Sequence, residues 1–331
     1  MKKILILSSS VLLLMTGCRQ YFEPNPKTLS KPIYVTKSID SSILDFNRNV
    51  ATLKNGEVLP INKKLPKGFI AIDKELAKKG NILLVAGDKQ IKFNKLIVTA
   101  KKHDNLIAVL FSDNHFALYD LNQNKTITAE KFGEFLAVRK FIAQPYFYKD
   151  LLLIPSLDGK LNIFDLRNNK LIKSFVVSQK DYFNNIIYLN VKNDNLIVAS
   201  RDRVIVISPN MVVNKDFNIN HVLVDDKNIY IFTIEGKIIK LNFALKEVAS
   251  KNFKYANIIF PMFYKNRIYF LVRGDKSFLI SIDKSLKDYT INPLKDESRK
   301  KVFCSDSLNL KADVFGANGT YYIEDFYIKL K

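Results

Sequence analysis

The chain has 331 residues, 47% of them hydrophobic and 12% aromatic, which excludes a disordered polymer and is enough for a large globular core. The formal charge is +20, and the lysines that dominate it occur singly or in pairs along the chain. No arginine cluster is interleaved with aromatic residues, so nucleic acid is not an expected partner. Weak attraction to an anionic envelope polymer stays open.

The N-terminus is organised like a bacterial lipoprotein signal. Met1–Lys3 is basic, and residues 4–15 are apolar but too few to span a bilayer comfortably. They end at Met15-Thr16-Gly17-Cys18, which resembles the lipobox of bacterial lipoproteins, with Met15 where leucine is usual. The resemblance implies cleavage before Cys18 and acylation of its thiol, palmitate included. We therefore expect a signal peptide over 1–17, a lipidated tether over 18–32 and the folded domain over 33–331.

The residue after Cys18 indicates the membrane to which the protein is attached. In enteric lipoproteins an aspartate there holds the protein at the inner membrane, and this chain has Arg19. We therefore expect the outer membrane, with the domain facing the periplasm. Two or three acyl chains make a stable anchor, at about 0.8 kcal/mol per buried CH₂. Cys304 has no partner once Cys18 is acylated, so we expect a buried core thiol and no disulfide.

A strand–turn–strand unit recurs along the chain. In its clearest copy the apolar strand Leu151–Leu157 is followed by Asp158-Gly159 and the return strand Lys160–Leu166, which predicts a two-residue type I′ hairpin. Equivalent turns fall near residues 113, 201, 235, 274 and 324. One further strand follows most hairpins, and another precedes each, including Phe135–Ala143 and Val302–Cys304. Four strands in about forty residues are typical of a propeller blade.

The predicted fold is therefore all-β, a β-propeller of four-stranded blades. Six units align, and we expect the irregular region 43–93 to hold one further blade, which makes seven; the alternative is eight, if that region holds two degenerate blades. The last unit stops after its third strand. We expect Pro32–Lys37 to supply the missing outer strand and so to close the ring.

The segment that follows the clearest turn carries a family resemblance. Asp158-Gly159-Lys160-Leu161 and the residues after it resemble the quinoprotein-type (PQQ-like) propeller repeat, and Glu235-Gly236-Lys237 is similar. A lipobox followed by such repeats is similar to the BamB family of outer-membrane β-barrel assembly lipoproteins. The resemblance implies a non-catalytic scaffold that docks on the POTRA domains of BamA. The chain has no Trp, although the quinoprotein repeat commonly ends in one, so no quinone or other cofactor is expected.

No catalytic or metal-binding pattern is visible. His103, His115 and His221 have no Cys, His or carboxylate at ligand spacing, so no metal site is expected. Aspartates lie in predicted turns, where they cap the backbone. We expect the aromatic runs Tyr146–Tyr148 and Phe260–Tyr264 to pack in inner strands, with a peptide-binding face as the alternative. Cys18 is the one site residue predicted.

The expected function is a lipid-anchored, non-enzymatic scaffold for protein–protein interactions in outer-membrane assembly, working as a monomeric propeller within a complex. Two alternatives stay open. A propeller lyase or glycosidase would need carboxylates and a His or Arg converging near the axis. An envelope factor would bind peptidoglycan or lipopolysaccharide through the basic surface.

Overall fold

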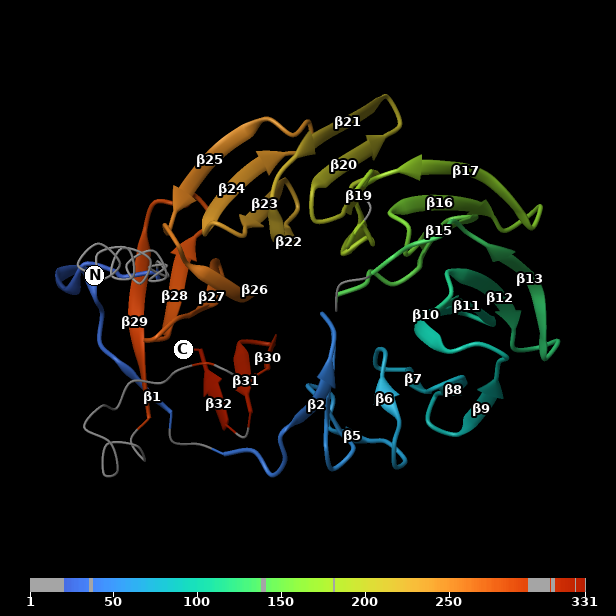
Figure 1. Cartoon of the computed structure of the whole chain (residues 1–331), viewed down its shortest axis with the longest axis horizontal. Helices are drawn as coiled ribbons and strands as arrows, with labels where there is room; N and C mark the ends of the chain where they lie inside the picture. The colour runs from blue at the N-terminus through green and yellow to red at the C-terminus, as the bar shows by residue number, and fades with distance from the viewer. Residues whose placement is uncertain are drawn as a thin grey trace, which may run out of the picture.

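The structure, a computed structural model, describes residues 21–35, 38–137, 141–180, 182–296, 310, 313–324 and 326–330. These residues form eight sheets that follow one another round a ring (Figure 1). The predicted all-β propeller is confirmed. It has eight blades, which was the alternative to the expected seven. Region 43–93 forms two blades because each half of it carries its own short hairpins.

The strands of the first four blades run in chain order from the axis outward. They are β2 (Ile43–Phe46), β3 (Ala51–Leu53), β4 (Glu57–Leu59) and β5 (Lys63–Lys64); β6 (Ile70–Ala71), β7 (Leu76–Lys79), β8 (Ile82–Val85) and β9 (Lys89–Lys92); β10 (Ile97–His103), β11 (Leu106–Phe111), β12 (His115–Asp120) and β13 (Lys125–Lys131); and β14 (Tyr146–Tyr148), β15 (Leu151–Pro155), β16 (Lys160–Asp165) and β17 (Lys170–Val176).

The other four blades complete the ring. A short 3₁₀ helix, η1 (Pro26–Thr28), precedes all eight blades in the chain. Their strands are β18 (Tyr188–Lys192), β19 (Asn195–Ala199), β20 (Arg203–Ser208) and β21 (Met211–Asp216); β22 (Ile219–Val224), β23 (Asn228–Thr233), β24 (Lys237–Asn242) and β25 (Glu247–Asn252); β26 (Asn257–Tyr264), β27 (Arg267–Arg273), β28 (Phe278–Asp283) and β29 (Tyr289–Asp296), joined by β1 (Ile33–Val35); and β30 (Val314–Ala317), β31 (Thr320–Ile323) and β32 (Phe326–Lys329).

Burial follows the position of a strand in its blade. The second strands, such as β11 and β23, are buried on both faces because neighbouring blades cover both sides of the sheet. The outermost strands, such as β13 and β17, are largely exposed and rich in lysine. Charged outer edges of this kind discourage pairing with other chains.

The hairpin turn at Asp158-Gly159 differs from the predicted type I′ geometry. Only Gly159 has a positive φ, +80°, and Asp158 stays outside the left-handed region. Ser156 N donates to Lys160 O at 2.9 Å, so three residues form the loop. A three-residue loop closes with one left-handed residue, and glycine takes that position without strain.

The predicted closing strand was wrong in its partner. β1 pairs in parallel with β29, with Ile33 opposite Leu294, and makes a fifth strand on the seventh blade. The last blade has three strands within the described residues and receives only an isolated bridge from Ser38 to Phe326. The open edge of β29 pairs with β1, whose Val35 packs beside Leu294 in the hydrophobic cluster at the join.

Two of the predicted first strands are not among the strands that the structure describes. Phe135–Ala143 is not a strand in its described part, and β14 takes that place. The turn at Lys149 is tight and puts Tyr148 opposite Leu151, so the paired strand must immediately precede it. Val302–Cys304 lies outside the described residues, and β30 is the first described strand of its blade.

Apolar side chains join the last blade to the first. One buried cluster unites Ala51 and Leu53 of the first blade with Phe315, Tyr321 and Ile323 of the last. Phe315 also contacts the seventh blade, where its ring lies 5.4 Å from that of Phe260 in a T-shaped arrangement. Backbone pairing at the join is one bridge among the residues that the structure describes, so packing closes the ring there. No helix in the described residues is long and apolar enough to cross a membrane.

Candidate functional site: the axial cavity

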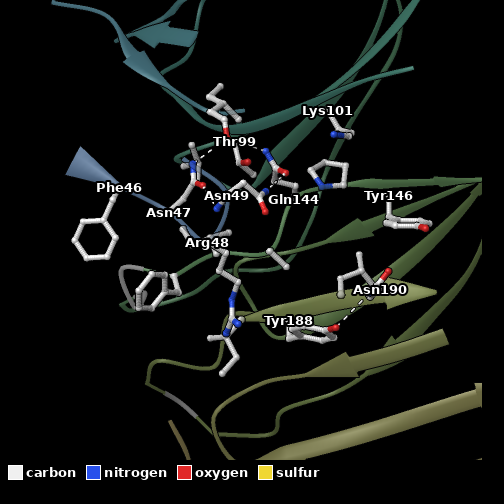
Figure 2. A pocket seen from close by; sticks show the side chains of 18 of the residues that line it. Phe46, Asn47, Arg48, Asn49, Thr99, Lys101, Gln144, Tyr146, Tyr188 and Asn190 are labelled. Carbon is white, nitrogen blue, oxygen red and sulfur yellow. Dashed lines mark hydrogen bonds between the residues drawn. The ribbon is translucent and has the colours of Figure 1, made fainter. Parts of the chain in front are cut away.

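A cavity of about 900 Å³ lies where the inner strands converge. Seven blades line it, through β2, β6, β10, β14, β18, β22 and β26. Its walls are mostly apolar and aromatic, with a few amides and cations among them (Figure 2). A concave, largely apolar chamber with a few polar groups is the usual form of a small-molecule site.

Side chains satisfy backbone groups at the inner edges of the blades. Lys78 Nζ donates to the carbonyls of Ile97 and Val98 at 3.1 and 2.6 Å, from the second blade to the third. Asn220 Nδ2 reaches the Ile258 carbonyl at 2.8 Å in the same way. An unpaired backbone group near the core is costly, so these donors stabilise the ring around the cavity.

The turn between β2 and β3 projects into the cavity. Asn47 Oδ1 accepts from the backbone N–H groups of Asn49 and Val50 at 2.8 and 3.2 Å, and Asn47 Nδ2 donates to Ile72 O at 2.8 Å. Asn49 in turn donates to Gln144 Oε1 at 3.0 Å. An Asx turn anchored to the next blade therefore fixes the residue at its centre.

That residue is Arg48, whose guanidinium extends along the cavity wall (Figure 2). Its Nη1 donates to Val222 O at 3.2 Å, a bond between the first and sixth blades. The guanidinium carbon lies 5.7 Å from the ring centre of Phe141 and 5.5 Å from that of Tyr188. Its Nε and Nη2 are shielded from solvent and have no hydrogen-bond partner in the described part of the chain. Burial lowers the pKa of Arg48 to about 10.

The neighbouring residues do not neutralise this charge. His221 is buried beside Arg48 with its ring 5.9 Å from Phe141. Desolvation, helped by the positive charges of Arg48 and Arg201, lowers the pKa of His221 to about 3. The imidazole is therefore neutral at physiological pH and adds no second positive charge beside Arg48.

Other cations at the cavity are already engaged. Lys101 Nζ lies 3.1 Å from the carboxylate of Asp73, and Lys78 is held by the two carbonyls described above. Asp45 is the one carboxylate among the described residues that line the cavity. The described lining therefore does not contain the pair of carboxylates that a glycosidase uses.

Those residues singled out from the sequence that the structure describes lie away from this chamber or in its wall. Cys18 and Cys304 fall outside the described residues. His103 stacks on Phe147 at 5.2 Å, and His115 Nδ1 lies 3.1 Å from Asp113. No group of three or more potential metal ligands occurs in the described residues.

The two aromatic runs are inner strands, as predicted. Tyr146–Tyr148 is β14, and Phe260–Tyr264 ends β26, with Phe260 and Met262 buried. Tyr146 and Phe263 also line the cavity, so the runs serve both the core and the chamber wall.

Asp158, in the repeat motif, links two blades. Asn114 Nδ2 donates to its Oδ1 at 3.1 Å, and Lys160 Nζ lies 2.9 Å from its Oδ2. Hydrogen bonds from Lys160, Ser156 and Asn114 outweigh desolvation and lower the pKa of its carboxyl. Asp225 shows the simple capping predicted for turn aspartates and accepts from the N–H groups of Lys227 and Asn228.

Sequence reasoning missed Arg48. The residue falls in the irregular region 43–93, where blade boundaries were hardest to place. A lone arginine flanked by two asparagines, in a chain that uses mainly lysine, was the available signal. Nothing in that signal shows that the turn points to the axis.

Comparison with known proteins gives one sequence likeness and several likenesses of fold. No protein-family model matches the chain. It is 24% identical over 383 aligned positions to "Plasminogen-binding protein PgbB" from two strains of Helicobacter pylori. Each alignment covers 97% of this chain and 70% of the relative.

Among solved structures, BamB from Moraxella catarrhalis matches with a TM-score of 0.60 and 12% identity, over 88% of this chain and 99% of that one. The C-terminal WD40 domain of Sif2 matches with a TM-score of 0.62 and 11% identity, over 92% and 99%. The computationally designed Ika8 protein matches with a TM-score of 0.57 and 10% identity, over 90% and 100%. These likenesses support a BamB-like propeller fold and, at such identities, the fold alone.

Proposed function

We propose that this chain is a lipid-anchored envelope protein whose propeller binds a protein partner and performs no catalysis. The observation that carries the proposal is the likeness to plasminogen-binding proteins, which extends over 97% of the chain and so includes the whole ring. The single carboxylate in the described cavity lining supports a binding role over acid–base chemistry. The first candidate partner is therefore plasminogen or a soluble protein of that kind.

The test is surface plasmon resonance with the purified full chain captured on lipid and plasminogen in solution. We expect saturable binding that weakens as salt rises, because the chain carries a formal charge of +20. Binding that never saturates would show nonspecific charge attraction and contradict the proposal. Lysozyme, which is also basic, captured at equal density is the control for charge alone.

A second candidate is the scaffold role in outer-membrane barrel assembly, which rests on the lipobox and the repeat resemblance. Pull-down of the lipidated protein from detergent-solubilised envelopes tests it. Recovery of barrel-assembly components at native expression supports this role, and their absence with plasminogen binding intact favours the first candidate. Salt-sensitive binding to isolated sacculi would instead indicate an envelope polymer as the partner.

The anchor is a separate part of the proposal. We propose lipidation of Cys18 and attachment to the outer membrane, with the propeller in the periplasm or beyond it. Cys18→Ala removes the thiol that takes the lipid, so we expect the protein to leave the membrane fraction. Metabolic labelling with palmitate and membrane fractionation measure this. Equal membrane recovery of wild type and variant would contradict lipid anchoring.

A further inference from the structure

The guanidinium of Arg48 leaves one complete edge without a partner. Nη1 donates to Val222 O, whereas Nε and Nη2 have no hydrogen-bond partner in the part of the chain that the structure describes. The Nε–H bond and one Nη2–H bond lie in the guanidinium plane along the same edge, and a carboxylate can accept both hydrogen bonds side-on, one with each oxygen. A buried donor left unsatisfied costs about 1–3 kcal/mol, and more when it is charged.

The surroundings of Arg48 match a carboxylate attached to an apolar group. Phe141 and Tyr188 face the guanidinium at 5.7 and 5.5 Å and stabilise its charge without satisfying its N–H groups. The described lining offers no carboxylate to Arg48, since its one acid, Asp45, lies beside Lys78. Apolar side chains make up most of the rest of the wall.

We infer that the axial cavity binds an organic acid with an apolar body, and that Arg48 binds its carboxylate. The cavity, at about 900 Å³, has room for such a molecule. Nε and Nη2 are shielded, so the guanidinium must turn its unpaired edge toward the cavity when the acid binds. One bond from the guanidinium to a neutral carbonyl is then exchanged for two bonds to a carboxylate, in which both the donor and the acceptor are ionised.

This inference does not depend on a protein partner. A free organic acid and the C-terminus of a peptide carry the same planar carboxylate. Two probes separate these sources: hydrocinnamate represents the free acid, and a short peptide with a C-terminal phenylalanine represents the chain end.

The experiment is calorimetric titration of the purified full chain, in a non-ionic detergent, with each probe. Hydrocinnamamide has nearly the same shape without the charge and is the matched control ligand. We expect hydrocinnamate to bind at least about tenfold more tightly than the amide, the effect of hydrogen bonds to a charged group. Equal binding of acid and amide would overturn the inference, as would no binding of either acid probe.

Variants locate the site. Arg48→Met removes the charge and should weaken hydrocinnamate binding at least about tenfold. Arg48→Lys keeps the charge but loses the two-donor edge, and we expect an intermediate loss. Arg203→Met removes an arginine that lies outside the cavity lining and is paired with Asp216, so binding should change less than twofold. An equal loss in the Arg48 and Arg203 variants would show general charge attraction and overturn the assignment.

A spectroscopic readout avoids dependence on variant folding. In wild-type protein labelled with ¹⁵N-arginine, the Nε–H resonance of Arg48 should move downfield as hydrocinnamate is added and stay in place with the amide. If the Arg48 resonance does not move at saturating acid, this guanidinium only stabilises the contact between blades, and the inference is overturned.

Discussion

Phe315 tests the idea that packing closes the ring. Its side chain is fully buried, and its ring lies 5.4 Å from Phe260 and 6.1 Å from Tyr322. Truncation of a buried phenylalanine to alanine costs about 3–5 kcal/mol, and the two ring contacts place Phe315→Ala in the upper part of that range. Total stabilities of domains are about 5–15 kcal/mol, so this is a large fraction.

Phe164 is the matched control. It is also fully buried and lies 6.0 Å from Phe116, but it packs inside the ring, between the third and fourth blades. Phe164→Ala should cost a similar free energy, measured by urea unfolding. The third and fourth blades follow one another directly in the chain, whereas Phe315 packs in the cluster that joins the last blade to the first, which are not consecutive in the chain.

Hydrogen exchange with mass spectrometry distinguishes the two variants. In Phe315→Ala we expect β30 and β31 to exchange faster than the rest of the ring, because the last blade opens locally before global unfolding. In Phe164→Ala the exchange of β30 and β31 should change no more than that of other blades. If β30 and β31 keep wild-type exchange in Phe315→Ala while global stability falls, then packing at this join is not what closes the ring.

Gly236 has φ +87°, and an added Cβ would lie 2.3 Å from a backbone carbonyl oxygen, so Gly236→Ala should cost roughly 2–4 kcal/mol in thermal unfolding. Gly80→Ala, whose Cβ meets only one side-chain carbon at 3.8 Å, should cost about 1 kcal/mol, and equal losses would contradict the steric reasoning. Folding lowers the pKa of His221 from 6.5 to about 3, so below pH 6.5 the unfolded chain binds more protons than the folded chain. The free energy of unfolding should therefore decrease as the pH falls from 6.5 toward 3. This site's slope should be at most about 1.4 kcal/mol per pH unit, and urea unfolding of wild type and His221→Gln at pH 7 and 4.5 checks that the variant loses it.

The sequence by itself determined the class of fold and the spacing of its blades. Local features show both. They are strands that are apolar on both faces, such as Leu151–Ile154, and turns that recur about every forty residues. Such features can be recognised in a sequence without the tertiary structure. The N-terminal signal ending at Cys18 is likewise a linear pattern, and it stays a prediction for the envelope experiments.

Tertiary structure alone decided how the ring closes and what lies at its centre. β1 has the same strand pattern whichever blade it joins, and the choice of β29 depended on which edge was open beside it. The residues next to Arg48 in the sequence predict an exposed turn, because no local pattern shows that the β2–β3 turn faces the axis. Sequence periodicity records which side chains are buried, whereas the meeting of seven inner strands around one cavity arises only when the blades are arranged in a circle.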